Sequence, residues 1–184
     1  MTFFQASGRG LLLALVVLLT AAGGAGRALA LTPEQALAIA QGDSDARIAA
    51  LNERVAAGDA SVRPFVQALL ADEVKLAGGK VLLVQGDQVR EAGSGARATL
   101  PEDAEDVVNN NRMRSALEAA LAAFSLASAD RAERAAAIEV LKDSVDEGLL
   151  PLLEKSAAAE SDPTLKARLE MLEAGALIAS PVAA

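Results

Sequence analysis

A change in the spacing of apolar residues between positions 73 and 100 constrains the fold of this chain more than any other feature. Before and after this window, apolar residues recur every three or four positions, as at Ile48, Leu51 and Val55, and this spacing predicts amphipathic helices. Inside the window, the apolar run 81–84 lies between two glycine-containing steps, which predicts short strands joined by tight turns. We therefore expect a mainly α fold with a small inserted antiparallel β-hairpin or meander.

Capping residues mark where the first helices begin. Thr32 precedes Pro33, which suits the first helical position, and Gln35 completes a capping box with Thr32. Asp43 or Ser44 is the expected cap of the second helix. The chain then divides into a leader at 1–30, N-terminal helices at 31–72, a β insertion at 73–100 and a helical region at 101–180.

A weak internal repeat links two of the later helices. Asp130 and Asp162 each stand at an expected helix start, and Arg134 and Lys166 follow four positions later. This pairing is typical of the second helix of HEAT-like helical hairpins, although the copies lie closer together than the usual repeat of about 40 residues. With 2% aromatic residues and many alanines, the helices are suited to close approach. HEAT-like hairpins and an ordinary helical bundle both fit this pattern.

The first thirty residues have the three parts of a secretory signal peptide. Arg9 precedes the apolar run 11–19, and small residues then lead to Ala28-Leu29-Ala30. The apolar run is well short of the about 20 residues that a bilayer span requires. We therefore expect export with cleavage after Ala30 and a periplasmic location, the alternative being an uncleaved membrane anchor.

The composition excludes several classes of function. The chain has no Cys and no His, so disulfides, Cys/His metal sites and Ser-His-Asp catalysis are ruled out. It has no Trp and no Tyr, and its net charge is −8, which argues against nucleic-acid binding. We expect a protein that is not an enzyme and that has no catalytic, cofactor-binding or metal-binding residues and no cofactor.

Two short motifs resemble catalytic or cofactor sites but are poorly placed for that chemistry. Gly93-Ser-Gly95 is part of a dinucleotide-like pattern, yet no helix is expected to start there, and an ordinary loop is favoured. Ser156 beside Lys155 suggests a Ser-Lys pair, but neighbouring residues on a helix do not face each other.

Four acidic residues follow Pro101 closely, namely Glu102, Asp103, Glu105 and Asp106. A divalent cation is one reading, but the spacing lacks the glycine turn and distal glutamate of an EF-hand. A catalytic carboxylate pair would need a cleft that the sequence does not indicate. We expect instead that helix resumes after Pro101 and that the acidic residues occupy its first turn, where they complement the helix dipole.

Three consecutive asparagines and two arginines form the most unusual run in the chain. Asn109, Asn110 and Asn111 are poor helix formers but strong caps, and Arg112 and Arg114 follow them. A single cap needs one asparagine. The other two are expected to hydrogen-bond a neighbouring loop, or to face a partner together with the two arginines.

This run carries a family resemblance. Residues 100–124, which contain the Asn-Asn-Asn-Arg-Met-Arg sequence, and the Leu-Ala-Ser-Ala-Asp-Arg step at 126–131 resemble the exported N-terminal region of the urea ABC transporter permease subunit. That subunit belongs to the branched-chain amino-acid class of importers, and the likeness extends less sharply from about Phe65 to about Ala174. The resemblance implies HEAT-like helical hairpins in a region that precedes the membrane permease.

The chain departs from that family in lacking the many membrane spans of the permease core and any P-loop. The resemblance therefore implies a non-catalytic periplasmic module for urea transport, whose partners are the importer permease or its substrate-binding protein. It would meet the membrane only through that transporter or an uncleaved leader. The expected contact residues are Asn110, Asn111, Arg112 and Arg114. The alternative is a free-standing exported HEAT-like protein-interaction module with another partner.

Overall fold

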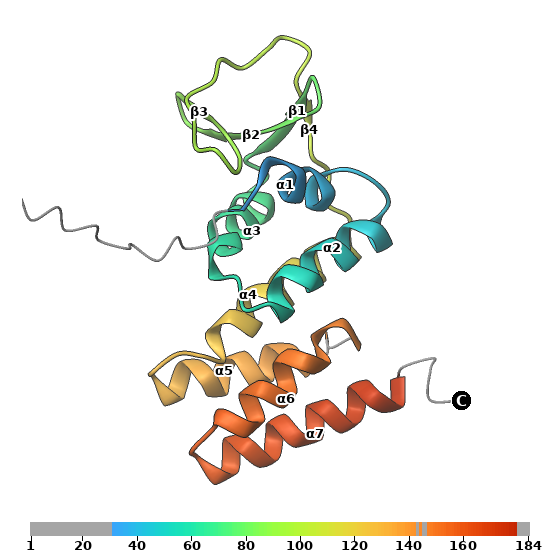
Figure 1. Cartoon of the computed structure of the whole chain (residues 1–184), viewed down its shortest axis with the longest axis vertical. Coiled ribbons are helices and arrows are strands. Elements are labelled where there is room, and N and C mark those ends of the chain that lie inside the picture. Colours follow the sequence, from blue (N-terminus) through green and yellow to red (C-terminus); the bar gives the residue numbers. More distant parts are fainter. Residues whose placement is uncertain (1–30, 143, 145–146, 180–184) are drawn as a thin grey trace, which may run out of the picture.

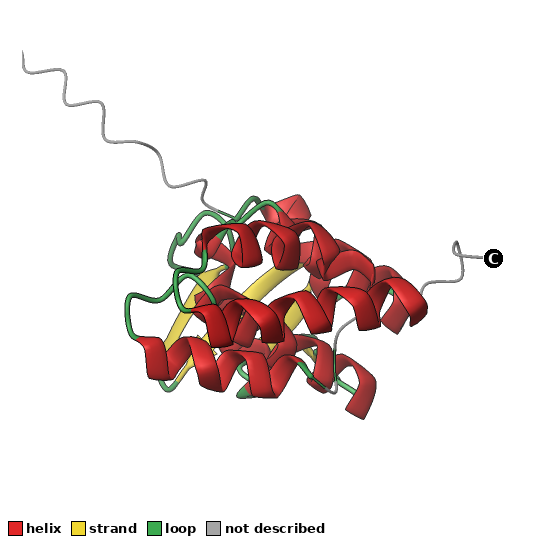
Figure 2. Cartoon of the chain, turned by 90° about the horizontal axis from the view of Figure 1, so that it is seen from below, coloured by secondary structure: helices red, strands yellow, loops and turns green. Residues whose placement is uncertain are grey.

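The computed structural model describes residues 31–142, 144 and 147–179, so the expected signal segment lies outside the described residues. A small sheet occupies one end of the molecule and a stack of helices the other (Figure 1). Viewed from below, the helices lie in front of the sheet (Figure 2). Mainly helical structure with a small antiparallel sheet was predicted, and this part of the prediction is confirmed.

The N-terminal helices begin where the sequence places their caps. They are α1 (Pro33–Ala40), α2 (Ser44–Ala56), the 3-10 turn η1 (Ala60–Val62) and α3 (Arg63–Leu70). Thr32 and Gln35 form the predicted capping box, and the Asp43 side chain accepts a hydrogen bond from the Ala46 N–H at the start of α2. Both caps were predicted from local sequence and are confirmed.

The sheet has four antiparallel strands in the order β3-β2-β1-β4. Its strands are β1 (Val74–Ala77), β2 (Lys80–Gln85), β3 (Gln88–Glu91) and β4 (Glu105–Asp106). The first three form the meander expected inside 73–100. Val74 and Val81 lie on the side of the meander that joins the common core.

The fourth strand corrects the prediction that helix resumes directly after Pro101. Glu105 and Asp106 pair with Leu76 and Lys75 of β1, and the Lys75 ammonium forms an ion pair with the Asp106 carboxylate. The acidic residues therefore lie on an extended segment and an edge strand instead of a first helical turn. A two-residue strand that pairs with a segment about 30 residues earlier leaves no local pattern to predict it.

The remaining helices run from α4 to the end of the described chain. They are α4 (Asn111–Ser125), α5 (Arg131–Leu141), the 3-10 turn η2 (Glu147–Leu149), α6 (Leu150–Ala159) and α7 (Pro163–Ala179). Helix α4 packs on α5, α6 packs on α7, and α5 packs on α7. Helix α2 contacts both α4 and α6 and so joins the two ends of the molecule.

One hydrophobic core runs through the described parts of the chain. Its fully buried large side chains include Ile39 in α1, Leu51 in α2, Leu117 in α4, and Leu153 and Leu169 in the last two helices. The sheet and the helical stack are therefore parts of one packed unit.

Candidate functional site

A buried arginine organises the region around the asparagine run. Arg47 of α2 is 5% exposed and donates three hydrogen bonds, from Nε to the Ile39 carbonyl oxygen (2.8 Å), from Nη1 to the Val108 carbonyl oxygen (3.0 Å) and from Nη2 to Asn109 Oδ1 (2.6 Å). All three acceptors are neutral, and burial lowers the pKa of the Arg47 guanidinium below its ordinary value. The guanidinium fastens α1, α2 and the segment before α4 to one another.

The three asparagines divide between structural and exposed positions. Asn109 is buried, and its amide also donates to the Leu69 carbonyl oxygen of α3 at 2.9 Å. Asn110 caps α4 by accepting from the Met113 N–H at 2.9 Å, and its amide donates to Ser44 Oγ at 2.8 Å. Asn111 is the first residue of α4 and is exposed. The expected cap is present, but the other hydrogen bonds run to α2 and α3 and not to a neighbouring loop.

The two arginines of the run point toward different helices. Arg114 donates from Nη2 to both carboxylate oxygens of Asp72 at 2.7 Å, and from Nη1 to the Leu70 carbonyl oxygen at 3.2 Å. Arg112 forms an ion pair with Asp45 in α2, and its side chain is 67% exposed. The four expected contact residues therefore do not form one open patch.

The exposed surface near the start of α4 is smaller than predicted. It includes one apolar residue that was not predicted. Val108 is 77% exposed, and it lies within four residues of the exposed Asn111 and Arg112. We call Val108, Asn111 and Arg112 the α4 corner. The buried Arg47 network directly beneath it fixes the backbone on which these side chains stand.

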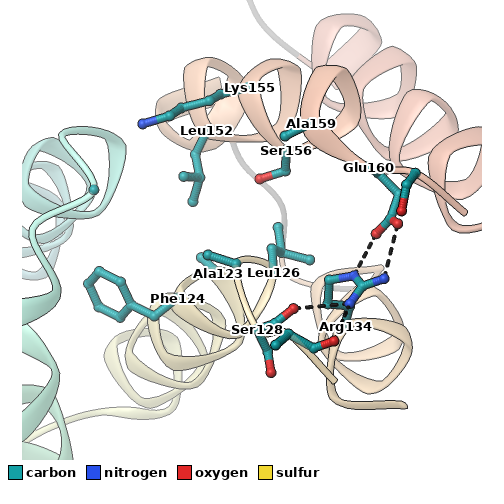
Figure 3. A pocket seen from close by; sticks show the side chains of 14 residues that line it. Ala123, Phe124, Leu126, Ser128, Arg134, Leu152, Lys155, Ser156, Ala159 and Glu160 are labelled. Atoms are coloured by element: carbon teal, nitrogen blue, oxygen red, sulfur yellow. Dashed lines mark hydrogen bonds and ion pairs between the residues drawn. The ribbon is translucent and has the colours of Figure 1, made fainter. Parts of the chain in front are cut away.

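Two arginines of α5 bind two carboxylates in the connection between α6 and α7. Arg134 pairs with Glu160 through two hydrogen bonds, from Nε to Oε2 at 2.7 Å and from Nη2 to Oε1 at 3.1 Å (Figure 3). Arg131 Nε donates to Asp162 Oδ2 at 2.6 Å. We call these four residues the α5–α7 clamp.

The residues of the clamp also form hydrogen bonds with backbone groups near the starts of α5 and α7. Asp162 accepts from the Leu165 N–H at 3.0 Å and so caps α7, and Arg134 Nη1 donates to the Ser128 carbonyl oxygen at 3.0 Å. The hydrogen bond from Arg134 lowers the pKa of Glu160, whose side chain is 3% exposed, and the hydrogen bond from Arg131 lowers the pKa of Asp162.

A pocket of about 560 Å³ lies between α6 and the α4–α5 connection (Figure 3). Its apolar lining includes Phe124, Leu126 and Leu152, and the Ser156 hydroxyl points into it. The Lys155 side chain extends away from Ser156, so this pair does not have the arrangement of a Ser-Lys catalytic site, as the sequence analysis expected.

The remaining motifs occupy the sheet end of the molecule. Gly93 lies in a loop at φ +90°, and a Cβ at this position would lie 2.7 Å from the Leu31 carbonyl oxygen and the Pro33 nitrogen. Glu102 and Asp106 are both exposed and do not form a buried carboxylate pair. The described residues include no group of three acidic side chains placed to hold a metal ion.

The last helices carry exposed apolar side chains. Met171 and Ile178 of α7 are 74% and 84% exposed, and Val140 of α5 is also exposed. Across the part of the chain that the structure describes, no helix combines the length and apolar character needed to cross a bilayer. The chain matches no protein-family model, no curated protein and no solved structure.

Proposed function

We propose that α4–α5 and α6–α7 are two HEAT-like helical hairpins and that the protein is a non-catalytic protein-interaction module. The α5–α7 clamp is the observation that carries this proposal. Asp130 and Asp162 occupy the same position at the starts of α5 and α7, and the arginines of α5 bind the carboxylates of Glu160 and Asp162 between α6 and α7. A helix pair that is joined to its neighbour in this way forms a stack, and stacked pairs offer extended surfaces to partners.

The resemblance of residues 100–131 to the urea ABC transporter permease subunit supports a particular setting for this module. We place it at the periplasmic face of the inner membrane, as the exported N-terminal part of a urea-type importer without the membrane permease core. Its partner is then the importer permease or the substrate-binding protein. The net charge of −8 favours partner surfaces with basic groups.

The α4 corner is the proposed contact surface. Of the four residues expected from the sequence, Asn110 and Arg114 hold the fold together through the cap and the Asp72 pair, so substitutions there change stability as well as binding. Asn111 and Arg112 are exposed and give a clean test of binding. Val108 adds an apolar centre to this surface.

The test measures binding of the purified chain to a detergent-solubilised urea-type importer and, separately, to its substrate-binding protein. Arg112→Glu reverses one exposed charge, and Val108→Ser removes the apolar centre. We expect the double variant to weaken binding at least about tenfold, a loss of about 1.4 kcal/mol, with little change in Tm. Arg97→Glu, an equal charge change in the exposed loop after β3, is the matched control.

Equal loss of binding in Arg97→Glu would point to long-range charge instead of the α4 corner. Absence of binding by the unaltered chain to either importer component would contradict the urea-transport setting.

A free-standing interaction module with another partner is the second candidate. The exposed Met171 and Ile178 favour it, because large exposed apolar side chains on a terminal helix are typical of contact surfaces. If Met171→Glu abolishes capture of a partner that is not an importer component, while Arg112→Glu does not, this candidate replaces the first.

A further inference from the structure

We propose that the pocket between α6 and the α4–α5 connection binds a small carboxylate with a compact apolar body. The carboxylate pairs with the Lys155 ammonium, and the apolar body rests on Phe124, Leu126 and Leu152. This site is separate from the α4 corner, and its test does not depend on the importer.

The size and lining of the pocket fit a small molecule. Its volume of about 560 Å³ lies within the range of roughly 300–1,000 Å³ that is common for small-molecule sites. Phe124 and Leu126 come from the end of α4, and Leu152 points toward them from α6 (Figure 3). These three side chains give the pocket an apolar floor between two polar ends.

The polar end near Gly58 is cationic and open. Lys155 lines the pocket, and its Nζ atom lies 3.9 Å from the Cβ position built at Gly58. Lys155 has no ion-pair partner among the residues that the structure describes, whereas eight other cations there form ion pairs. The guanidinium of Arg63, outside the pocket lining, lies 5.6 Å from the centroid of the Phe124 ring.

Neither of the two carboxylates at the ends of the pocket forms an ion pair with Lys155. Asp59, next to Gly58, is buried and accepts from the Ser61 N–H at 3.1 Å and from its hydroxyl. Glu160 lies at the opposite end and is paired with Arg134 (Figure 3). Because no described carboxylate pairs with Lys155, a ligand carboxylate is the complementary group there.

The Arg134–Glu160 pair also distinguishes a small molecule from a peptide. It lies at the end of the pocket opposite Lys155, and both of its side chains line the pocket. A polypeptide running along the whole pocket would have to displace this bidentate ion pair, whereas a small ligand at the Lys155 end would leave it in place.

The experiment follows backbone amide shifts of the full chain by NMR during titration with hexanoate at neutral pH and low salt. Two matched probes separate the groups: hexanamide keeps the apolar body without the charge, and acetate keeps the charge without the body. We expect saturable shifts around Phe124, Leu152 and Lys155 with hexanoate, at a Kd in the millimolar range, and at least fivefold weaker binding of both other probes.

Variants assign the binding to the pocket. Lys155→Gln removes the cation, and Ser156→Leu fills the space into which the serine hydroxyl points. Each should weaken hexanoate binding about fivefold or more without lowering Tm. Lys142→Gln, which removes an exposed lysine outside this pocket, should leave binding unchanged. Unsaturable shifts, equal binding of hexanamide, or full binding by Lys155→Gln would overturn the proposal.

A last titration tests the choice of a small molecule. The probe is an acetylated alanine tripeptide with a free carboxyl end, and its amide is the control. We expect weaker binding than for hexanoate. Tighter binding that requires the free carboxylate would overturn the assignment to a small molecule in favour of a protein carboxyl end.

Discussion

The two ends of this molecule are held together by different means. At the sheet end, the buried Arg47 joins segments that lie far apart in the chain, since Asn109 is 62 residues away. At the helical end, neighbouring hairpins are joined near the surface by the α5–α7 clamp, whose partners are about 30 residues apart. The sheet end therefore depends on a few buried polar contacts between distant segments, whereas the helical end distributes its stability over local packing and two ion pairs, of which only Arg131–Asp162 is substantially exposed.

Of the substitutions considered, replacing Arg47 should destabilise the sheet end most. Arg47→Met leaves three acceptors without their donor, and each buried unsatisfied group costs about 1–3 kcal/mol. We expect the free energy of unfolding, measured by urea titration, to fall by about 4 kcal/mol. Arg112→Met removes an exposed ion pair and should change the free energy of unfolding by about 0.5 kcal/mol or less. Similar losses in both variants would show that burial is not what sets Arg47 apart.

A substitution at Gly93 tests the close contact between the loop after β3 and the backbone at the start of α1. Gly93→Ala combines a positive φ with a Cβ that meets backbone atoms of Leu31 and Pro33, and these cannot move without shifting the α1 cap. We expect a loss of about 3 kcal/mol in the free energy of unfolding. Gly95→Ala has a positive φ but open space, and should cost about 1 kcal/mol. Equal costs would mean that the close approach at Gly93 relaxes freely.

Single alanine substitutions in the asparagine run should give graded effects. Asn109→Ala removes one hydrogen-bond partner each from Arg47 and from the Leu69 carbonyl oxygen, and we expect it to lower the free energy of unfolding by about 2–3 kcal/mol. Asn110→Ala removes the α4 cap, and we expect a loss of about 1 kcal/mol. Asn111→Ala should have almost no effect. Three equal values from urea unfolding would contradict the division of roles at this run.

The clamp should make the helical end sensitive to acid. Because the folded-state pKa values of Glu160 and Asp162 are lowered, their stabilising contribution is present above their ordinary pKa values of about 4 and is lost as the pH falls through the lowered values. The Tm of the unaltered chain should therefore fall more steeply between about pH 5 and pH 3 than that of the Arg131→Gln, Arg134→Gln double variant. Parallel curves would show that the clamp does not contribute to acid unfolding.

How far the sequence predicts each region follows from the range of the interactions. The caps Thr32, Asp43 and Asp130 act within three residues, so local sequence was enough to place α1, α2 and α5. The meander was predictable because glycines mark its turns. HEAT-like stacking of the later helices remains a proposal, since a repeat with two clear copies gives only a weak pattern.

Two of the missed features, β4 and the Arg47 network, depend on long-range contacts. β4 exists because Glu105 and Asp106 meet β1, and nothing near them in sequence indicates an extended segment. The position of Arg47 could have indicated a buried charge. It precedes Ile48 and lies four positions before Leu51, on the buried side of α2, and a charged residue on that side requires buried partners. Its partners at positions 108 and 109 could not be identified without the fold.

The Arg47 network also has a consequence for the order in which the chain is made. Synthesis proceeds from the N-terminus, so α1, α2 and α3 emerge well before Val108 and Asn109, which supply two of the three acceptors for the Arg47 guanidinium. Until then, these helices carry a cation that must stay hydrated, and they cannot close their core around it. We therefore expect the N-terminal helices to reach their final packing only after residue 109 has been synthesised.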